Sequence, residues 1–209
     1  TKALSLTINS TVVANQSIAS KSLTQNISYS SFIPVTASSG TASYTYAIAP
    51  SLPSGMIFSG STGSISGTAT AANAATNYTV TVTDASGATA SQYFSLTVNP
   101  SLTTAQAIPI SVLSQNALAA SFIPVTASQG TTPYSYALSG AVLPAGLIYS
   151  GTTGEVSGTP SVTLASTTYT VTVTDAVGAT SSKTFTIQVT GDATLSNLLL
   201  SSGSLSPSF

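Results

Sequence analysis

The residue types that most enzymes use are scarce in this chain. It has no His and no Cys, which excludes Ser–His and Cys–His nucleophiles, His-based metal sites and disulfides. Its acidic residues are Asp84, Glu155, Asp175 and Asp192. A glycosidase needs two carboxylates facing each other across a cleft. Asp84 and Asp175 occupy equivalent turns of a repeated sequence, so we expect them to lie about a domain length apart. We therefore predict no catalytic residues and no enzyme activity.

Calcium is the metal that isolated acidic residues most readily suggest. It takes six to eight oxygen ligands and is usually held by clustered carboxylates. The stretch around Asn99 has no acidic residue, and Asp192 stands alone in its stretch. The sequence thus predicts no metal and no cofactor, with a weak calcium site at Asp192 as the alternative to an ordinary linker residue.

Hydroxyl ladders are a second candidate for surface chemistry. Alternate positions of two expected strands carry threonine: Thr79, Thr81 and Thr83, and Thr170, Thr172 and Thr174. A flat threonine array could order water or a crystalline polysaccharide face. Threonine is also a good solvent-facing strand residue, and we prefer that interpretation.

Tyrosine pairs raise the possibility of sugar stacking. Tyr44 and Tyr46 in the first half return as Tyr134 and Tyr136 in the second, each pair separated by Thr or Ser. A position in the core that both repeats share explains this recurrence better than a sugar platform does. A carbohydrate-binding accessory module of a secreted enzyme remains the alternative function.

These residues lie in a sequence that repeats about 90 residues further on. SFIPVTAS at 31–38 returns at 121–128, and TVTVTDA at 79–85 returns at 170–176. Alternating apolar and Thr positions predict strands, and Asp-Ala-x-Gly after each TVTVT run predicts a hairpin turn. Several short strands per repeat, separated by Gly or Pro, predict antiparallel β-sandwiches.

The repeats set the domain boundaries. We expect an N-terminal strand extension at 1–9, one Ig-like domain at 10–99, a second at 100–190, and a partial third module or donor strand at 191–209. The joint at Asn99–Ser101 is short, which limits swivelling. The predicted fold is all-β: two tandem Ig-like sandwiches in a rod, with unpaired terminal strand segments.

The order of motifs resembles a known family. SFxPVTAS, YxY, LPxG, TGxxSGT and YTVTVTDAxG follow one another in both repeats, as in the bacterial "putative Ig" family, a relative of the cadherin-like sandwiches of large surface proteins. The segment from Asp192 to Phe209 resembles the opening of a cadherin-like β-sandwich domain. The resemblance implies an extracellular location on a bacterial cell surface and a stalk-type or adhesin-type architecture, and it brings no catalytic residues.

Apolar residues at both ends need a partner. A strand-like alternation places them in the two terminal segments: Leu4, Leu6, Ile8, Leu195, Leu198, Leu199, Leu200 and Leu205. Too few residues surround them to form a core, so they either continue into a further module or add a strand to a neighbouring molecule. The expected partners are adjoining domains of the same chain or other copies of it, and possibly surface glycans.

Composition narrows the partners further. Charged residues make up 3% of the chain, against roughly 25% in ordinary domains. Its three Lys residues cannot neutralise a run of phosphates, which excludes nucleic acid, and no apolar stretch reaches transmembrane length. We predict a non-enzymatic extracellular structural protein, either the stalk of an adhesin or a self-assembling filament subunit linked by β-strand addition.

Overall fold

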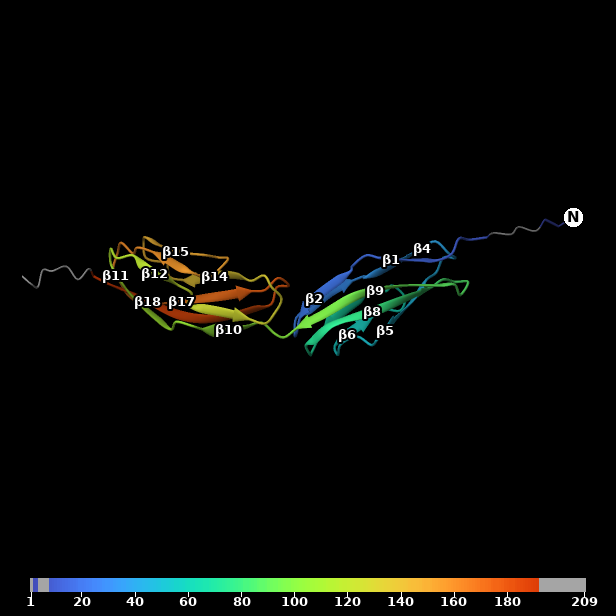
Figure 1. Ribbon diagram of the computed structural model, residues 1–209, viewed down its shortest axis with the longest axis horizontal. Helices are drawn as coiled ribbons and strands as arrows, with labels where there is room; N and C mark the ends of the chain where they lie inside the picture. Colours follow the sequence, from blue (N-terminus) through green and yellow to red (C-terminus); the bar gives the residue numbers. More distant parts are fainter. Residues whose placement is uncertain (1, 4–7, 192–209) are drawn as a thin grey trace, which may run out of the picture. The chain divides into compact units, whose positions relative to one another are not determined.

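The computed structural model describes residues 2–3 and 8–191, and every regular element in these ranges is a β-strand. The chain forms two compact units, one built mainly from residues 1–102 and the other mainly from residues 103 onward. Strands β1–β9 make up domain 1 and β10–β18 make up domain 2 (Figure 1). This confirms the predicted all-β class and the tandem Ig-like sandwiches.

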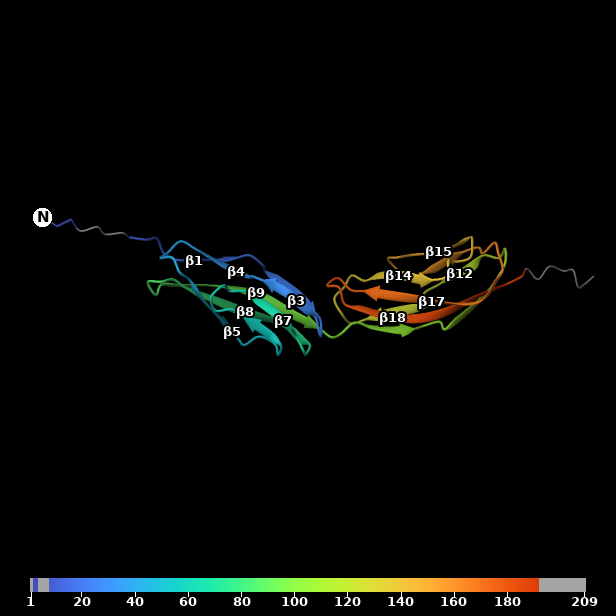
Figure 2. The same ribbon diagram turned by 180° about the vertical axis from the view of Figure 1, so that it is seen from behind.

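Domain 1 contains a four-stranded sheet, a three-stranded sheet and a short two-stranded ribbon. The four-stranded sheet has the order β2 (Ser20–Thr24), β9 (Thr89–Asn99), β8 (Asn73–Thr83) and β5 (Thr45–Ala49). The three-stranded sheet has the order β3 (Ser28–Phe32), β7 (Ile65–Thr68) and β6 (Met56–Phe58); Figure 2 labels β3 and β7. The ribbon pairs β1 (Val13–Gln16) with β4 (Val35–Ser38).

Domain 2 repeats this plan strand for strand. Its four-stranded sheet has the order β11 (Ile110–Ser114), β18 (Thr180–Thr190), β17 (Leu164–Thr174) and β14 (Ser135–Gly140). Its three-stranded sheet has the order β12 (Ala119–Phe122), β16 (Val156–Gly158) and β15 (Leu147–Tyr149). Its ribbon pairs β10 (Thr103–Gln106) with β13 (Val125–Ser128).

The long hairpins form where alternation predicts them. In β8 the Tyr and Val positions are buried, and the intervening Thr positions face outward. The antiparallel partner β9 follows across the Asp84–Gly87 turn, in which Gly87 has a φ of 86°. Apolar side chains on one face of each strand therefore meet inside the sandwich.

Each domain has its own apolar core. In domain 1 the fully buried side chains include Leu23, Val35, Ile65, Val80, Val82, Phe94 and Leu96. In domain 2 they include Val125, Val156, Tyr169, Val171, Val173, Phe185 and Ile187. The aromatic arrangement is also shared, because the Phe94 ring lies 5.6 Å from the Tyr78 ring, as Phe185 does from Tyr169.

The terminal assembly residues fall mostly outside the described part of the chain. Leu4, Leu6, Leu195, Leu198, Leu199, Leu200 and Leu205 all lie there. Ile8 is described, belongs to no strand and is 85% exposed. The first strand of domain 1 begins at Val13 instead, where pairing with β4 becomes possible.

Candidate functional site

The Asp84 carboxylate holds a turn together. Its Oδ1 accepts hydrogen bonds from the backbone N–H groups of Ser86 and Ala88, both at 2.9 Å. Its Oδ2 accepts one from the Thr41 N–H at 2.8 Å, which ties the hairpin to a loop far away in the sequence. The bond from Thr41, followed by that from the Ser86 hydroxyl, lowers the pKa of Asp84.

Asp175 does the same work in domain 2. Its Oδ1 accepts hydrogen bonds from the N–H groups of Val177 (3.0 Å) and Ala179 (2.8 Å), and its Oδ2 from that of Thr131 (2.9 Å). Burial would raise the pKa of Asp175, but the hydrogen bonds to the carboxylate outweigh it and lower the pKa. Several hydrogen bonds to a carboxylate favour its charged form, and here they hold the hairpin turns in place.

The remaining acidic residues form no metal centre in the part of the chain that the structure describes. Glu155 is half-buried directly before β16. Asp192 lies outside the described residues, so the calcium alternative at this position stays a prediction. Among residues 2–3 and 8–191, no three His, Cys, Asp or Glu side chains come together in a way that could hold a metal ion.

The tyrosines of both pairs are half-buried. Tyr44 and Tyr46 both lie against the hydrophobic core of domain 1. The Tyr46 ring covers Gly63 so closely that a Cβ at this glycine would come within 2.8 Å of Cδ1. Tyr136 covers Gly154 at the same 2.8 Å. Backbone therefore occupies one ring face in each domain, which favours a packing role over sugar stacking.

The threonine ladders are partly paired with neighbouring hydroxyls. Thr81 Oγ1 lies 2.9 Å from Ser91 Oγ across the hairpin, and Thr172 Oγ1 lies 2.9 Å from Ser182 Oγ. Cross-strand hydroxyl pairs of this kind stabilise a sheet. The ladders therefore have a structural use that needs no ligand.

The pairing of an early strand with the last strand is the feature of each domain best suited to a function. In domain 1, β2 pairs in parallel with β9 from Ser20↔Ser95 to Thr24↔Asn99. In domain 2, β11 pairs in parallel with β18 from Ile110↔Thr186 to Ser114↔Thr190. All other strand pairs among the described residues are antiparallel.

The parallel pairing of two strands from opposite ends of a domain's sequence has a mechanical consequence. Tension toward the N-terminus pulls β2 one way, while tension toward the C-terminus pulls β9 the other way. The strands are then loaded in shear along their length, so the hydrogen bonds between them carry the force together. Two further bonds flank this ladder, from Ser95 N–H to Ala19 O and from Gln25 N–H to Asn99 O, each at 2.9 Å.

Sequence reasoning missed this pairing because a parallel pair leaves no local turn signal. Four of the five residues of β2 are polar, which is typical of a loop or an edge segment. The apolar Leu23 between them, equivalent to Leu113 in domain 2, was the available signal.

Comparisons with known proteins agree with this architecture. The family model "Putative Ig domain" matches residues 9–99 and again residues 100–190. A comparison with curated protein sequences gave no match. No helix among the described residues has the length and apolarity needed to cross a membrane.

Several solved structures are similar to this chain at low sequence identity. The I67–I69 I-band fragment of titin is 13% identical with a TM-score of 0.51, over 90% of this chain and 67% of the fragment. Extracellular domains 3–5 of Drosophila OTK are 12% identical with a TM-score of 0.45, over 87% of this chain and 60% of theirs. Cadherin domains 1–4 of protocadherin gamma B7 are 15% identical with a TM-score of 0.40, over 87% of this chain. The chain spans about half the length of that protocadherin fragment (51%).

The two family matches together cover most of the chain and coincide with the two sandwiches that the strand order defines. The chain belongs to the "Putative Ig domain" family, of which it carries two tandem copies.

Proposed function

We propose that this protein is a non-enzymatic structural module of an extracellular stalk, in which each domain resists tension through the parallel pairing of its terminal strands. The five-residue parallel ladder, present in both domains, is the observation that carries the proposal. The expected partners are the adjoining domains of the same chain. The scarcity of charge supports this role, because a stalk needs no charged binding surface.

Extracellular location is part of the same proposal. Ig-like and cadherin-like sandwiches are typical of extracellular structural and adhesion proteins, and this chain belongs to such a family. The Asp84 and Asp175 carboxylates bind backbone N–H groups in turns. The Tyr46 and Tyr136 rings pack on glycine backbone. Both observations support a structural role over catalysis or sugar binding.

The ladder offers a matched pair of substitutions in β2. The flanking bonds of Ala19 and Gln25 show that the backbone N–H and C=O groups of the odd-numbered residues in this segment point toward β9. The N–H of Thr24 instead donates to the Tyr29 hydroxyl at 2.5 Å, so the even-numbered residues face the other way. Proline lacks an N–H, so Lys21→Pro removes a bond of the ladder and Ser22→Pro removes none.

Single-molecule pulling of the full chain from its two ends tests the proposal. We expect two unfolding events, and Lys21→Pro should lower the force of the domain 1 event while Ser22→Pro leaves it near the wild-type value. In domain 2, Ser111→Pro and Val112→Pro form the same matched pair. Equal effects of the two prolines within a pair would refute the role of the ladder in resisting tension.

A further inference from the structure

Each sandwich has one side on which an edge strand of the four-stranded sheet faces an edge strand of the three-stranded sheet. This side is built differently in the two domains. In domain 1 the edge strands are β2 and β3, and in domain 2 they are β11 and β12. Pairing with Gly67 fixes Tyr29 in β3, and pairing with the equivalent Gly158 fixes Ala119 in β12. Tyr29 and Ala119 therefore occupy the same place in the two domains, and the two edges can be compared residue by residue.

Domain 1 closes its edge with two long side chains. Tyr29 packs against the hydrophobic core, and its hydroxyl accepts the hydrogen bond from Thr24 N–H. Lys21 Nζ lies 5.8 Å from the centroid of the Phe32 ring. Leu23 beneath them is completely buried. A lysine on an edge strand also discourages the addition of another strand.

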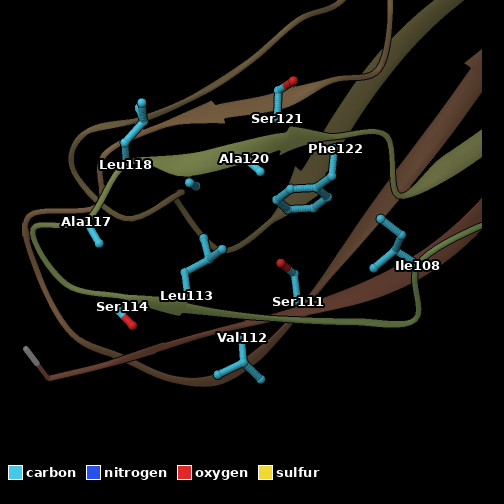
Figure 3. A pocket seen from close by; sticks show the side chains of 11 residues that line it. Ile108, Ser111, Val112, Leu113, Ser114, Ala117, Leu118, Ala120, Ser121 and Phe122 are labelled. Carbon is cyan, nitrogen blue, oxygen red and sulfur yellow. The ribbon is translucent and has the colours of Figure 1, made fainter. Parts of the chain in front are cut away.

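Domain 2 lacks these covering side chains. Ser111 stands in place of Lys21, and Ala119 in place of Tyr29. A groove of about 410 Å³ opens between β11 and β12 as a result. Figure 3 shows Leu113 and Ser111 pointing across it toward the Phe122 ring. Leu113 is only half-buried, unlike its counterpart in domain 1.

The outward-facing positions beside the groove are also more apolar in domain 2. Ile110, Val112 and Leu118 are 60%, 60% and 80% exposed. The same positions in domain 1 carry exposed serines: Ser20, Ser22 and Ser28. Compared with domain 1, this edge of domain 2 therefore has smaller inward side chains and more apolar outward side chains. No residue lining the groove is charged, so the surface suits an uncharged apolar segment.

The chain itself supplies such a segment beside the groove. β18 ends at Thr190, which pairs with Ser114 at the end of β11 and accepts a hydrogen bond from Gln115 N–H at 2.9 Å. The sequence that continues from this rim has no charged residue after Asp192 and contains Leu195 and Leu198–Leu200. Five extended residues reach about 16 Å, enough to turn back along β11.

We propose that residues 195–200 dock in the groove between β11 and β12 of the same molecule, with their leucines filling the space that Tyr29 occupies in domain 1. The short tether gives this segment a millimolar effective concentration at the groove, which favours it over the same segment of a second copy. Apolar contact with Leu113 and Phe122 and the free backbone edges of β11 and β12 hold it there. The docked segment fixes the direction in which the chain leaves domain 2. This inference rests on the edge of domain 2 and not on the stalk function, so a pulling experiment can fail without affecting it.

Paramagnetic NMR on the full chain tests this docking. The chain has no native Cys, so Ser202→Cys provides a single site for a spin label. We expect the label to remove most of the methyl signal intensity of Leu113 and Leu118, and to leave Leu23, the matched position in domain 1, unchanged. The Ala119→Tyr variant, which restores the domain 1 side chain, should clearly weaken the broadening of the Leu118 signal.

A mixture separates the possible occupants. Spin-labelled chains without methyl labels are mixed with methyl-labelled chains without a spin label. No broadening is expected in this mixture. Broadening there would assign the groove to a second copy, and no broadening in either sample would mean that the segment does not dock; both results overturn the proposal. Broadening that Ala119→Tyr leaves unchanged would place the segment outside the groove and overturn it as well.

Discussion

Replacing Phe94 by alanine should weaken domain 1 severely. The side chain is completely buried in β9, 5.6 Å from the Tyr78 ring and 6.5 Å from the Phe32 ring. Removal of a buried phenylalanine costs about 3–5 kcal/mol, against a total stability of about 5–13 kcal/mol for a domain of this size. At about 4–8 °C for each kcal/mol, the melting temperature of domain 1 should fall by about 12–40 °C.

Tyr93→Ala is the matched control, because Tyr93 precedes Phe94 in the same strand and is 59% exposed on the opposite face. We expect it to change the free energy of unfolding by no more than about 0.5 kcal/mol. Hydrogen exchange with mass spectrometry, followed in peptides from β8 and β9 across a temperature series, assigns the loss to domain 1. Similar shifts for the two variants, or a shift below about 5 °C for Phe94→Ala, would refute the assignment of the core face.

Three smaller predictions concern single side chains. Tyr149 Oη is buried and makes no hydrogen bond, the only such side-chain atom among the described residues, and burial, followed by the charge of Tyr136, raises the pKa of Tyr149 to about 12. Because the buried hydroxyl has no partner, Tyr149→Phe should stabilise domain 2 by about 1 kcal/mol. The raised pKa means that the stability of domain 2 is unaffected by this group below about pH 10 and falls as the pH rises toward 12, so the variant should also reduce alkaline unfolding in a denaturant titration. The folded-state pKa of Asp84 is lowered, so its contribution to the stability of domain 1 is complete above about pH 5 and is lost as the pH falls through that pKa. Asp84→Asn should therefore lower the melting temperature at pH 7 and reduce the loss of stability at acid pH. An unchanged loss of stability at acid pH would contradict the role of Asp84 in the turn. Gly63→Ala should destabilise domain 1 by about 1–3 kcal/mol in chemical unfolding, because Gly63 has a φ of +71° and its Cβ would approach the Tyr46 ring; a neutral result would contradict the packing of this ring.

Local signals explain which parts of the fold were predictable. The β8–β9 hairpin could be predicted because alternating Val and Thr set the strand and Asp84 with Gly87 set the turn. The reach of the Asp84 carboxylate to Thr41 could not, since it joins residues 43 positions apart. Long-range bonds of this kind depend on how the loops meet, and no short motif encodes them.

The candidate surfaces were hidden from the sequence for a related reason. The groove of domain 2 results from two small residues, Ser111 and Ala119, on strands of different sheets. Each is unremarkable alone, and only their shared position against Leu113 creates the space. Comparing the repeats position by position would have revealed the change from Tyr29 to Ala119, but not that both positions line one edge.

The direction dependence of unfolding tests the stalk proposal most directly. Cysteines introduced at Ser20 and Asn99 attach force to opposite ends of the β2–β9 ladder and load it in shear, whereas cysteines at Ser20 and Ser95 attach force at one end and peel it. We predict a clearly higher unfolding force for the Ser20–Asn99 attachment, since all hydrogen bonds of the ladder then share the load. Equal forces for the two attachments would contradict the claim that the parallel terminal strands give the domain its resistance to tension.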